Sequence, residues 1–122
     1  IIGMASGVFC FLSVTSLKSR FGYDDSLDAF GVHGVGGIIG ALLTGVFAAK
    51  GLGGVGLAEG MTIRKQLAAQ SIGVLFTLTY SGLFSFMILK AIDATIGLRV
   101  EPEHETEGLD IVLHNERGYN FR

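Results

Sequence analysis

Three long runs of residues without Asp, Glu, Lys or Arg constrain the fold of this 122-residue chain more than any other feature. They cover residues 1–17, 29–49 and 66–89. A helix needs roughly 20 apolar residues to cross the hydrocarbon core of a bilayer. Each run is therefore long enough, or nearly so, for one membrane span. The first run begins at Ile1 without a Met, so we interpret it as a span cut short at its start.

The rest of the sequence favours the same class, an all-α membrane protein. Hydrophobic residues make up 49% of the chain and charged residues 16%, whereas soluble domains average about 25% charged residues. The net charge is −2 and there is no basic block, so we expect no nucleic acid partner. The helical pattern after residue 89 continues to about residue 98, which predicts a third helix over 66–98. A short charged loop (18–28) and a longer loop with five glycines (50–65) join the runs.

His33 is the one ionisable side chain inside the second run, apart from the run's edges. An imidazole is costly in a bilayer, and such groups often line a pathway or pair with another group. It could equally be a helix-end histidine that is hydrogen-bonded to a neighbouring helix. A metal ligand or an intramembrane base would need a second group at the same depth, and the other histidines, His104 and His114, lie in the tail. We therefore expect no enzyme, no catalytic residue and no metal or cofactor.

Small residues recur every four positions along the second run, which predicts close helix packing. One such series is His33, Gly37, Ala41 and Gly45, and the other is Gly36, Gly40 and Thr44. The loop charges do not orient the spans, because the Lys and Arg residues divide almost evenly between the two sides. They are Lys18, Arg20, Lys90 and Arg99 on one side and Lys50, Arg64 and Lys65 on the other.

Four segments in order resemble the ammonium transporter (Amt/Mep/Rh) family, most closely its bacterial Amt type. The first is DDSLDAFGVHGVGGIIGALLTGVFA, residues 24–48. The others are GLGGVGLAEG (51–60), TIGLRV (95–100) and EGLDIVLHNERGYN (107–120). The resemblance covers essentially the whole chain. It implies the ninth to eleventh spans of an eleven-span fold (residues 1–98, with spans at about 1–17, 29–49 and 66–98), followed by a cytoplasmic tail (99–122).

The resemblance also implies a function and a set of site residues. Amt proteins conduct ammonium or ammonia through a pore in each protomer of a homotrimer, and two pore histidines touch each other. His33 matches the second of these, and Ala29 and Phe30 match positions along the pore. Asp28, Gly34 and Gly37 match the pore mouth and helix packing. An ammonium sensor that signals to a cytoplasmic partner is the alternative function.

The tail has its own predicted features. Pro102 suits the first turn of a helix and Gly108 the position just past its end, so residues 101–107 should form a short acidic helix. By resemblance, the regulatory tail residues are Gly108, Leu109, Asp110 and Tyr119. The resemblance also implies a multi-pass cell-membrane protein with a cytoplasmic C-terminus, and a possible partner of the PII nitrogen regulatory type.

Overall fold

The first apolar run forms one continuous helical span in the computed structural model, which describes residues 1–118. The α-helix α1 (Ile2–Leu12) passes into a π-helical turn, η1 (Ser13–Leu17), and then into the short helix α2 (Lys18–Phe21). The loop predicted to begin at residue 18 is therefore wrong at its start. The span continues for one more turn and ends at Gly22, whose φ of +60° is the left-handed conformation common at helix C-termini.

The second span lies within the predicted range 29–49. It begins with a π-helical turn, η2 (Phe30–Gly34), and continues as the α-helix α3 (Val35–Phe47). A π-turn contains one more residue than the corresponding α-turn. The residues on either side of η2 are therefore rotated relative to an uninterrupted α-helix.

A glycine-rich turn follows α3 and contains the short 3-10 helix η3 (Lys50–Leu52). It is closed by a hydrogen bond from the backbone N–H of Gly56 to the carbonyl oxygen of Ala48, at 2.8 Å. Gly53 has a φ of +89°, a conformation that is open to glycine because it has no Cβ. The glycine-rich loop thus contains a tight turn in which a glycine adopts a positive φ.

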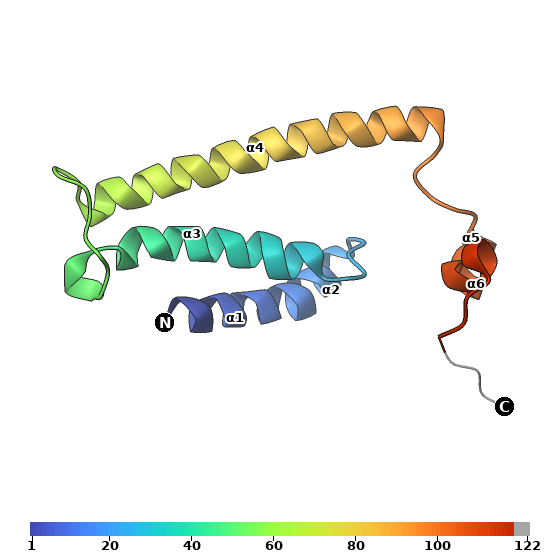
Figure 1. Cartoon of the computed structure of the whole chain (residues 1–122), viewed down its shortest axis with the longest axis horizontal. Helices are drawn as coiled ribbons and strands as arrows, with labels where there is room; N and C mark the ends of the chain where they lie inside the picture. Colours follow the sequence, from blue (N-terminus) through green and yellow to red (C-terminus); the bar gives the residue numbers. More distant parts are fainter. Residues whose placement is uncertain (119–122) are drawn as a thin grey trace. The chain divides into compact units, whose positions relative to one another are not determined.

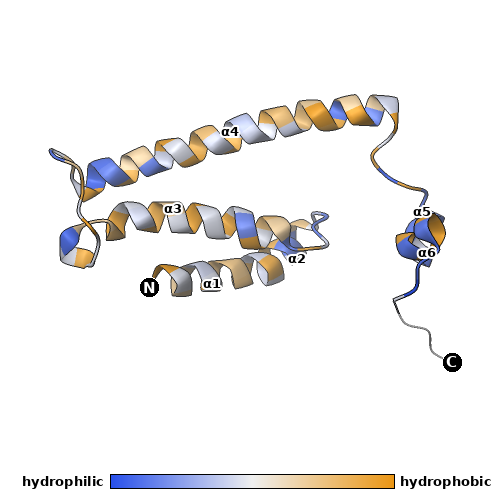
Figure 2. Ribbon diagram, in the orientation of Figure 1, coloured by the Kyte–Doolittle hydropathy of each residue, from blue (hydrophilic) through white to orange (hydrophobic). Residues whose placement is uncertain are grey.

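The third span is the 33-residue α-helix α4 (Ile63–Thr95). It begins and ends three residues earlier than the predicted 66–98, and it continues through Lys90 and Asp93 as predicted. At 1.5 Å per residue it is about 50 Å long, so it exceeds the thickness of a hydrocarbon core. Figure 2 shows that hydrophilic residues on this helix gather towards its two ends.

The chain divides into two units, residues 1–79 and the part from Tyr80 onward, with the division inside α4. In the first unit, α1 and α3 lie side by side and run in opposite directions (Figure 1). Within residues 1–118 no apolar side chain is buried, and the buried residues are Ser13, Gly31 and Gly45. These helices therefore meet through small residues that allow close backbone approach, as membrane helices do.

The second unit contains the C-terminal part of α4 and two short helices, α5 (Pro102–Glu107) and α6 (Leu109–His114). Pro102 occupies the first turn of α5 and Gly108 follows its last residue, so the predicted short helix is confirmed. The predicted boundary between membrane part and tail, at residues 98 and 99, stays a prediction.

The predicted all-α class is confirmed, because residues 1–118 contain helices and no strand. Three helices in this range are long and apolar enough to cross a membrane, over Ile2–Phe21, Phe30–Phe47 and Ile63–Thr95. Large apolar side chains on α4 remain exposed, among them Ile72 and Phe76 at 68% each. Such surfaces are typical of helices that lie against lipid or further protein.

Candidate functional site

His33 lies in η2, at the start of the second span, and borders a groove between α3 and the first half of α4. The groove has a volume of about 470 Å³. Its walls include His33, Gly37 and Ala41 on one side and Gln70, Gly73 and Thr77 on the other. The imidazole is exposed within the described chain. Among residues 1–118, no group of three or more His, Cys, Asp or Glu residues could hold a metal ion.

The carboxylate of Asp25 caps the helix that carries His33. It accepts hydrogen bonds from the backbone N–H groups of Ala29 at 2.8 Å, Phe30 at 3.0 Å and Gly31 at 3.4 Å. The first N–H groups of a helix have no partner within the helix, and a negative charge is favourable at this end of the helix dipole. Asp25 therefore fixes where the second span begins.

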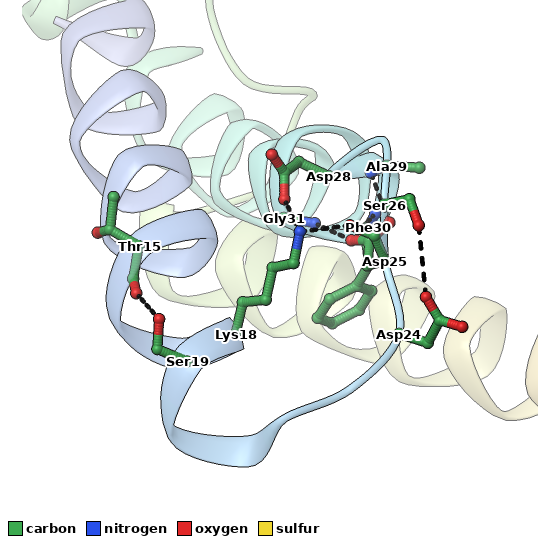
Figure 3. A network of polar contacts seen from close by, with 10 residues as sticks. All are labelled: Thr15, Lys18, Ser19, Asp24, Asp25, Ser26, Asp28, Ala29, Phe30 and Gly31. Atoms are coloured by element: carbon green, nitrogen blue, oxygen red, sulfur yellow. Dashed lines mark hydrogen bonds and ion pairs between the residues drawn. The ribbon is translucent and has the colours of Figure 1, made fainter. Parts of the chain in front are cut away.

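Lys18, at the end of the first span, contacts two of the three acidic residues between the first two spans, Asp25 and Asp28 (Figure 3). Its Nζ donates to the backbone carbonyl oxygen of Asp25 at 2.6 Å and to Oδ1 of Asp28 at 2.7 Å. The Lys18 and Asp28 side chains are 30% and 39% exposed, so this ion pair is partly shielded from solvent. Asp28 has a φ of +54°, which is uncommon for a residue with a side chain. We call Lys18, Asp25 and Asp28 the lysine clamp.

The first span also packs directly on the turn that contains His33. A Cβ on Gly31 would lie 2.6 Å from Cγ1 of Val14, and a Cβ on Gly36 would lie 3.0 Å from Sγ of Cys10. The Cys10 thiol donates a hydrogen bond to the backbone carbonyl oxygen of Val32, 3.3 Å from Sγ. These contacts hold η2 and the start of α3 against the first span.

Each of the two predicted small-residue series packs closely at one position within this chain and not at every position. A Cβ on Gly37 would meet no atom within 4 Å, so within this chain the close approach is made by Gly36, one residue earlier. Gly45, in the same series as Gly37, does pack closely. A Cβ there would lie 2.9 Å from Cγ of Gln70 and 3.5 Å from Cα of Leu67. The series that His33 begins thus contacts α4 at Gly45 and borders the groove at Gly37.

The remaining residues predicted at the pore lie in or beside η2. Ala29 precedes η2, and its N–H is bound by Asp25. Phe30 makes an edge-to-face contact with Tyr23, with ring centroids 5.9 Å apart. Gly34 lies under the Phe30 ring, since a Cβ on Gly34 would be 2.9 Å from Phe30 Cδ2. Their roles along a pore stay predictions.

In the tail, the residues predicted to be regulatory lie around the junction of α5 and α6. Gly108 joins the two helices with φ +98° and ψ +125°. Leu109 and Asp110 form the first turn of α6. Tyr119 lies outside the described residues.

Sequence analysis missed three features that shape the site. It treated Lys18 and Asp25 as charges in a loop and gave Asp28 only a pore-mouth role by resemblance, although an Asp shortly before an apolar run is a known helix-start signal. It assigned no packing role to Gly31, and it did not predict the π-turn. A π-turn has no sequence signature of its own here, because its residues are as apolar and as glycine-rich as their neighbours.

The sequence comparisons agree with this arrangement of apolar helices. Residues 1–119 match the Ammonium Transporter Family. The ammonium transporter of Aquifex aeolicus is 48% identical over 121 residues, covering 98% of this chain and 28% of that protein. The ammonium transporter of Bacillus subtilis is 40% identical over 124 residues (98% and 30%), and Amt1 of Archaeoglobus fulgidus is 36% identical over 120 residues (98% and 30%).

The chain thus spans less than a third of the length of each of these relatives. The match nevertheless covers nearly all of its residues and includes all three apolar helices. This combination identifies a multi-pass membrane protein. On both grounds, the family match and the relatives, the chain belongs to the Ammonium Transporter Family.

Proposed function

We propose that this protein acts in the transport of ammonium or ammonia across a membrane, through a pore that His33 lines. The observation that carries the proposal is the position of His33. Its imidazole borders a groove on an otherwise apolar span, and the backbone around it is held by the lysine clamp and by Cys10 and Val14. Such an ionisable group within a span is a functional candidate by default.

The chemistry of an imidazole suits this substrate. An ammonium ion carries a full charge and is costly to bring into an apolar pore, whereas neutral ammonia costs far less. A neutral imidazole has one nitrogen that donates and one that accepts a hydrogen bond. It can therefore accept a bond from ammonia and, paired with a second histidine as the family resemblance implies, pass a proton separately. Potassium has no proton to give up, so this route would reject it.

We further propose that the protein works as a homotrimer with a cytoplasmic tail, and that a PII-type protein can bind its cytoplasmic face. These proposals rest on the family resemblance of residues 107–120 and on the helix junction at Gly108. The proposed action is transport and not enzymatic catalysis.

A chimera provides the test of the transport proposal. This chain would replace the segment that it matches in the Aquifex aeolicus relative, in cells that lack their own ammonium transporters. Ammonium-dependent growth and ammonium-evoked current would be measured, with potassium as the competing ion. We expect the chimera to transport and His33→Ala to lower discrimination against potassium by about tenfold, the factor that corresponds to roughly 1.4 kcal/mol. His114→Ala, an exposed histidine of α6, is the matched control and should change neither quantity.

Unchanged flux and unchanged selectivity in His33→Ala would remove the assigned role of this residue. A sensor would give a different result. It would bind ammonium and alter the binding of a cytoplasmic partner, while current and growth stayed at the level of cells without the chimera.

A further inference from the structure

We propose that Lys18 is a positioning residue for His33, and that it acts by holding the first turn of the second span in its π-helical register. The inference rests on the proposed function of His33 and adds a second residue, from another span, to the same site. Lys18 itself would not contact the transported molecule.

The lysine clamp links the first span to the start of the second through one side chain. Lys18 Nζ contacts the Asp25 carbonyl oxygen at 2.6 Å and Asp28 Oδ1 at 2.7 Å, while the Asp25 carboxylate binds three backbone N–H groups at the start of η2. The side-chain ammonium group of Lys18 thus links the end of the first span to the Asp25 backbone and to the Asp28 side chain, just before the second span begins (Figure 3). It also offsets the repulsion between two neighbouring carboxylates.

The lysine clamp contacts a residue with an uncommon backbone conformation. Asp28 is in the left-handed region with φ +54°. Its N–H donates to the Asp25 carbonyl oxygen at 3.1 Å, and its own carbonyl oxygen accepts from the N–H of Val32 at 2.8 Å. Conformations of this kind persist where surrounding contacts determine them. Lys18 supplies such a contact, because it binds the Asp28 side chain directly.

The backbone at the clamp leads directly into the π-turn that carries His33. Residues in an α-helix are about 100° apart around the helix axis, so the extra residue of a π-turn changes the direction of the residues before the turn relative to the α-helix after it. His33 lies inside η2, between the clamp and the α-helix α3. If η2 relaxed to an α-turn, either His33 would leave the groove or the clamp would break.

The first span contacts η2 and the residues before it at several successive positions. The series Cys10, Val14 and Lys18 meets the second span, or the residues just before it, at each of its three residues, and the π-turn η1 lies within this series. Cys10 binds the Val32 carbonyl oxygen and Val14 lies against Gly31. Lys18 is the polar end of this series, so removing its charge should release the N-terminal end of η2 while the apolar contacts remain.

The test uses the same chimera, in which transport and the effect of His33→Ala are measured first. We expect Lys18→Gln to lower selectivity for ammonium over potassium by about two- to tenfold, within the range found for coupled neighbouring residues. Lys18→Arg, which keeps the charge, should restore part of this loss. Arg20→Gln, an exposed basic residue of the same helix α2, is the matched control and should leave selectivity unchanged.

The decisive measurement is the double variant. If Lys18 acts through His33, Lys18→Gln should change selectivity no further in a His33→Ala background. Additive effects of the two substitutions would overturn the inference, as would unchanged selectivity in Lys18→Gln alone. Should Lys18→Gln not assemble, Asp28→Asn replaces it in the same cycle, because it removes the partner's charge and keeps an acceptor oxygen. If His33→Ala itself has no effect, the proposed function fails, and this result is distinct from a failure of the clamp alone.

Discussion

Val14 lies so close to Gly31 that a Cβ on Gly31 would come within 2.6 Å of Val14 Cγ1. Gly31 is buried, and it forms part of the π-turn that carries His33. The first two spans therefore meet at this glycine, where their backbones approach more closely than a side chain would allow.

Gly31→Ala should destabilise the protein, whereas Gly37→Ala should not. The new methyl group on Gly31 meets a β-branched side chain that has few rotamers to move into. Overpacking of this kind typically costs about 1–3 kcal/mol. A Cβ on Gly37 meets no atom of the described chain within 4 Å. The measurement is the melting temperature of the purified chimera. Equal melting temperatures for the two variants would contradict the assigned contact between Val14 and Gly31.

A second prediction concerns the turn after α3. A Cβ on Gly54 would collide with backbone atoms of Phe47 and Ala48, whereas one on Gly51 would meet nothing within 4 Å. Backbone cannot move aside as a flexible side chain can, so Gly54→Ala should cost about 1–3 kcal/mol. Gly51→Ala is the matched control and should be close to neutral. The two variants would be compared by yield and thermal melting, and a neutral Gly54→Ala would mean that the turn has a different backbone path.

A third prediction concerns the Asp25 cap. Asp25→Ala removes the acceptor for the N–H groups of Ala29, Phe30 and Gly31, and loss of a helix cap costs about 0.5–2 kcal/mol. Asp25→Asn keeps one acceptor oxygen and should lose less. Thermal melting measures the stability, and hydrogen exchange of these three amides reports the cap directly. Equal protection of the amides in wild type and Asp25→Ala would rule out the capping role.

The last prediction concerns Gly108, which joins α5 and α6 with φ +98°. A Cβ there has open space around it, so the cost of Gly108→Asp is backbone strain, roughly 1 kcal/mol or more. The added charge also lies near Glu107 and Asp110 in the sequence. We expect the protein to reach the membrane and assemble, with impaired transport. Gly118→Asp adds the same charge where φ is not positive and should transport normally.

Co-expression with unmodified protein tests whether the tail couples protomers. Ammonium flux, normalised to surface protein, should fall more steeply than the fraction of Gly108→Asp protein. Flux that falls only in proportion to this fraction would mean that the tail does not act on neighbouring protomers.

The helical class and the approximate extent of every long helix could be predicted from the order of residues. This was possible because a bilayer imposes one requirement, a run of apolar residues of sufficient length, and that requirement is visible residue by residue. The two ends of α5 could also be predicted from the sequence, because Pro102 and Gly108 act on the backbone locally. The family motif around His33 identified this candidate pore residue from the sequence alone.

The way in which the start of the second span is held became visible only in three dimensions. The π-turn η2 rotates the residues before it relative to α3, and in this structure Gly36, and not Gly37, meets the first span. The lysine clamp likewise joins residues 18 and 28, which come together only after the chain has turned between two spans. A sequence pattern records which residues are small or charged. It does not record a helix rotation set by contacts between separate segments, and the direction in which His33 faces depends on that rotation.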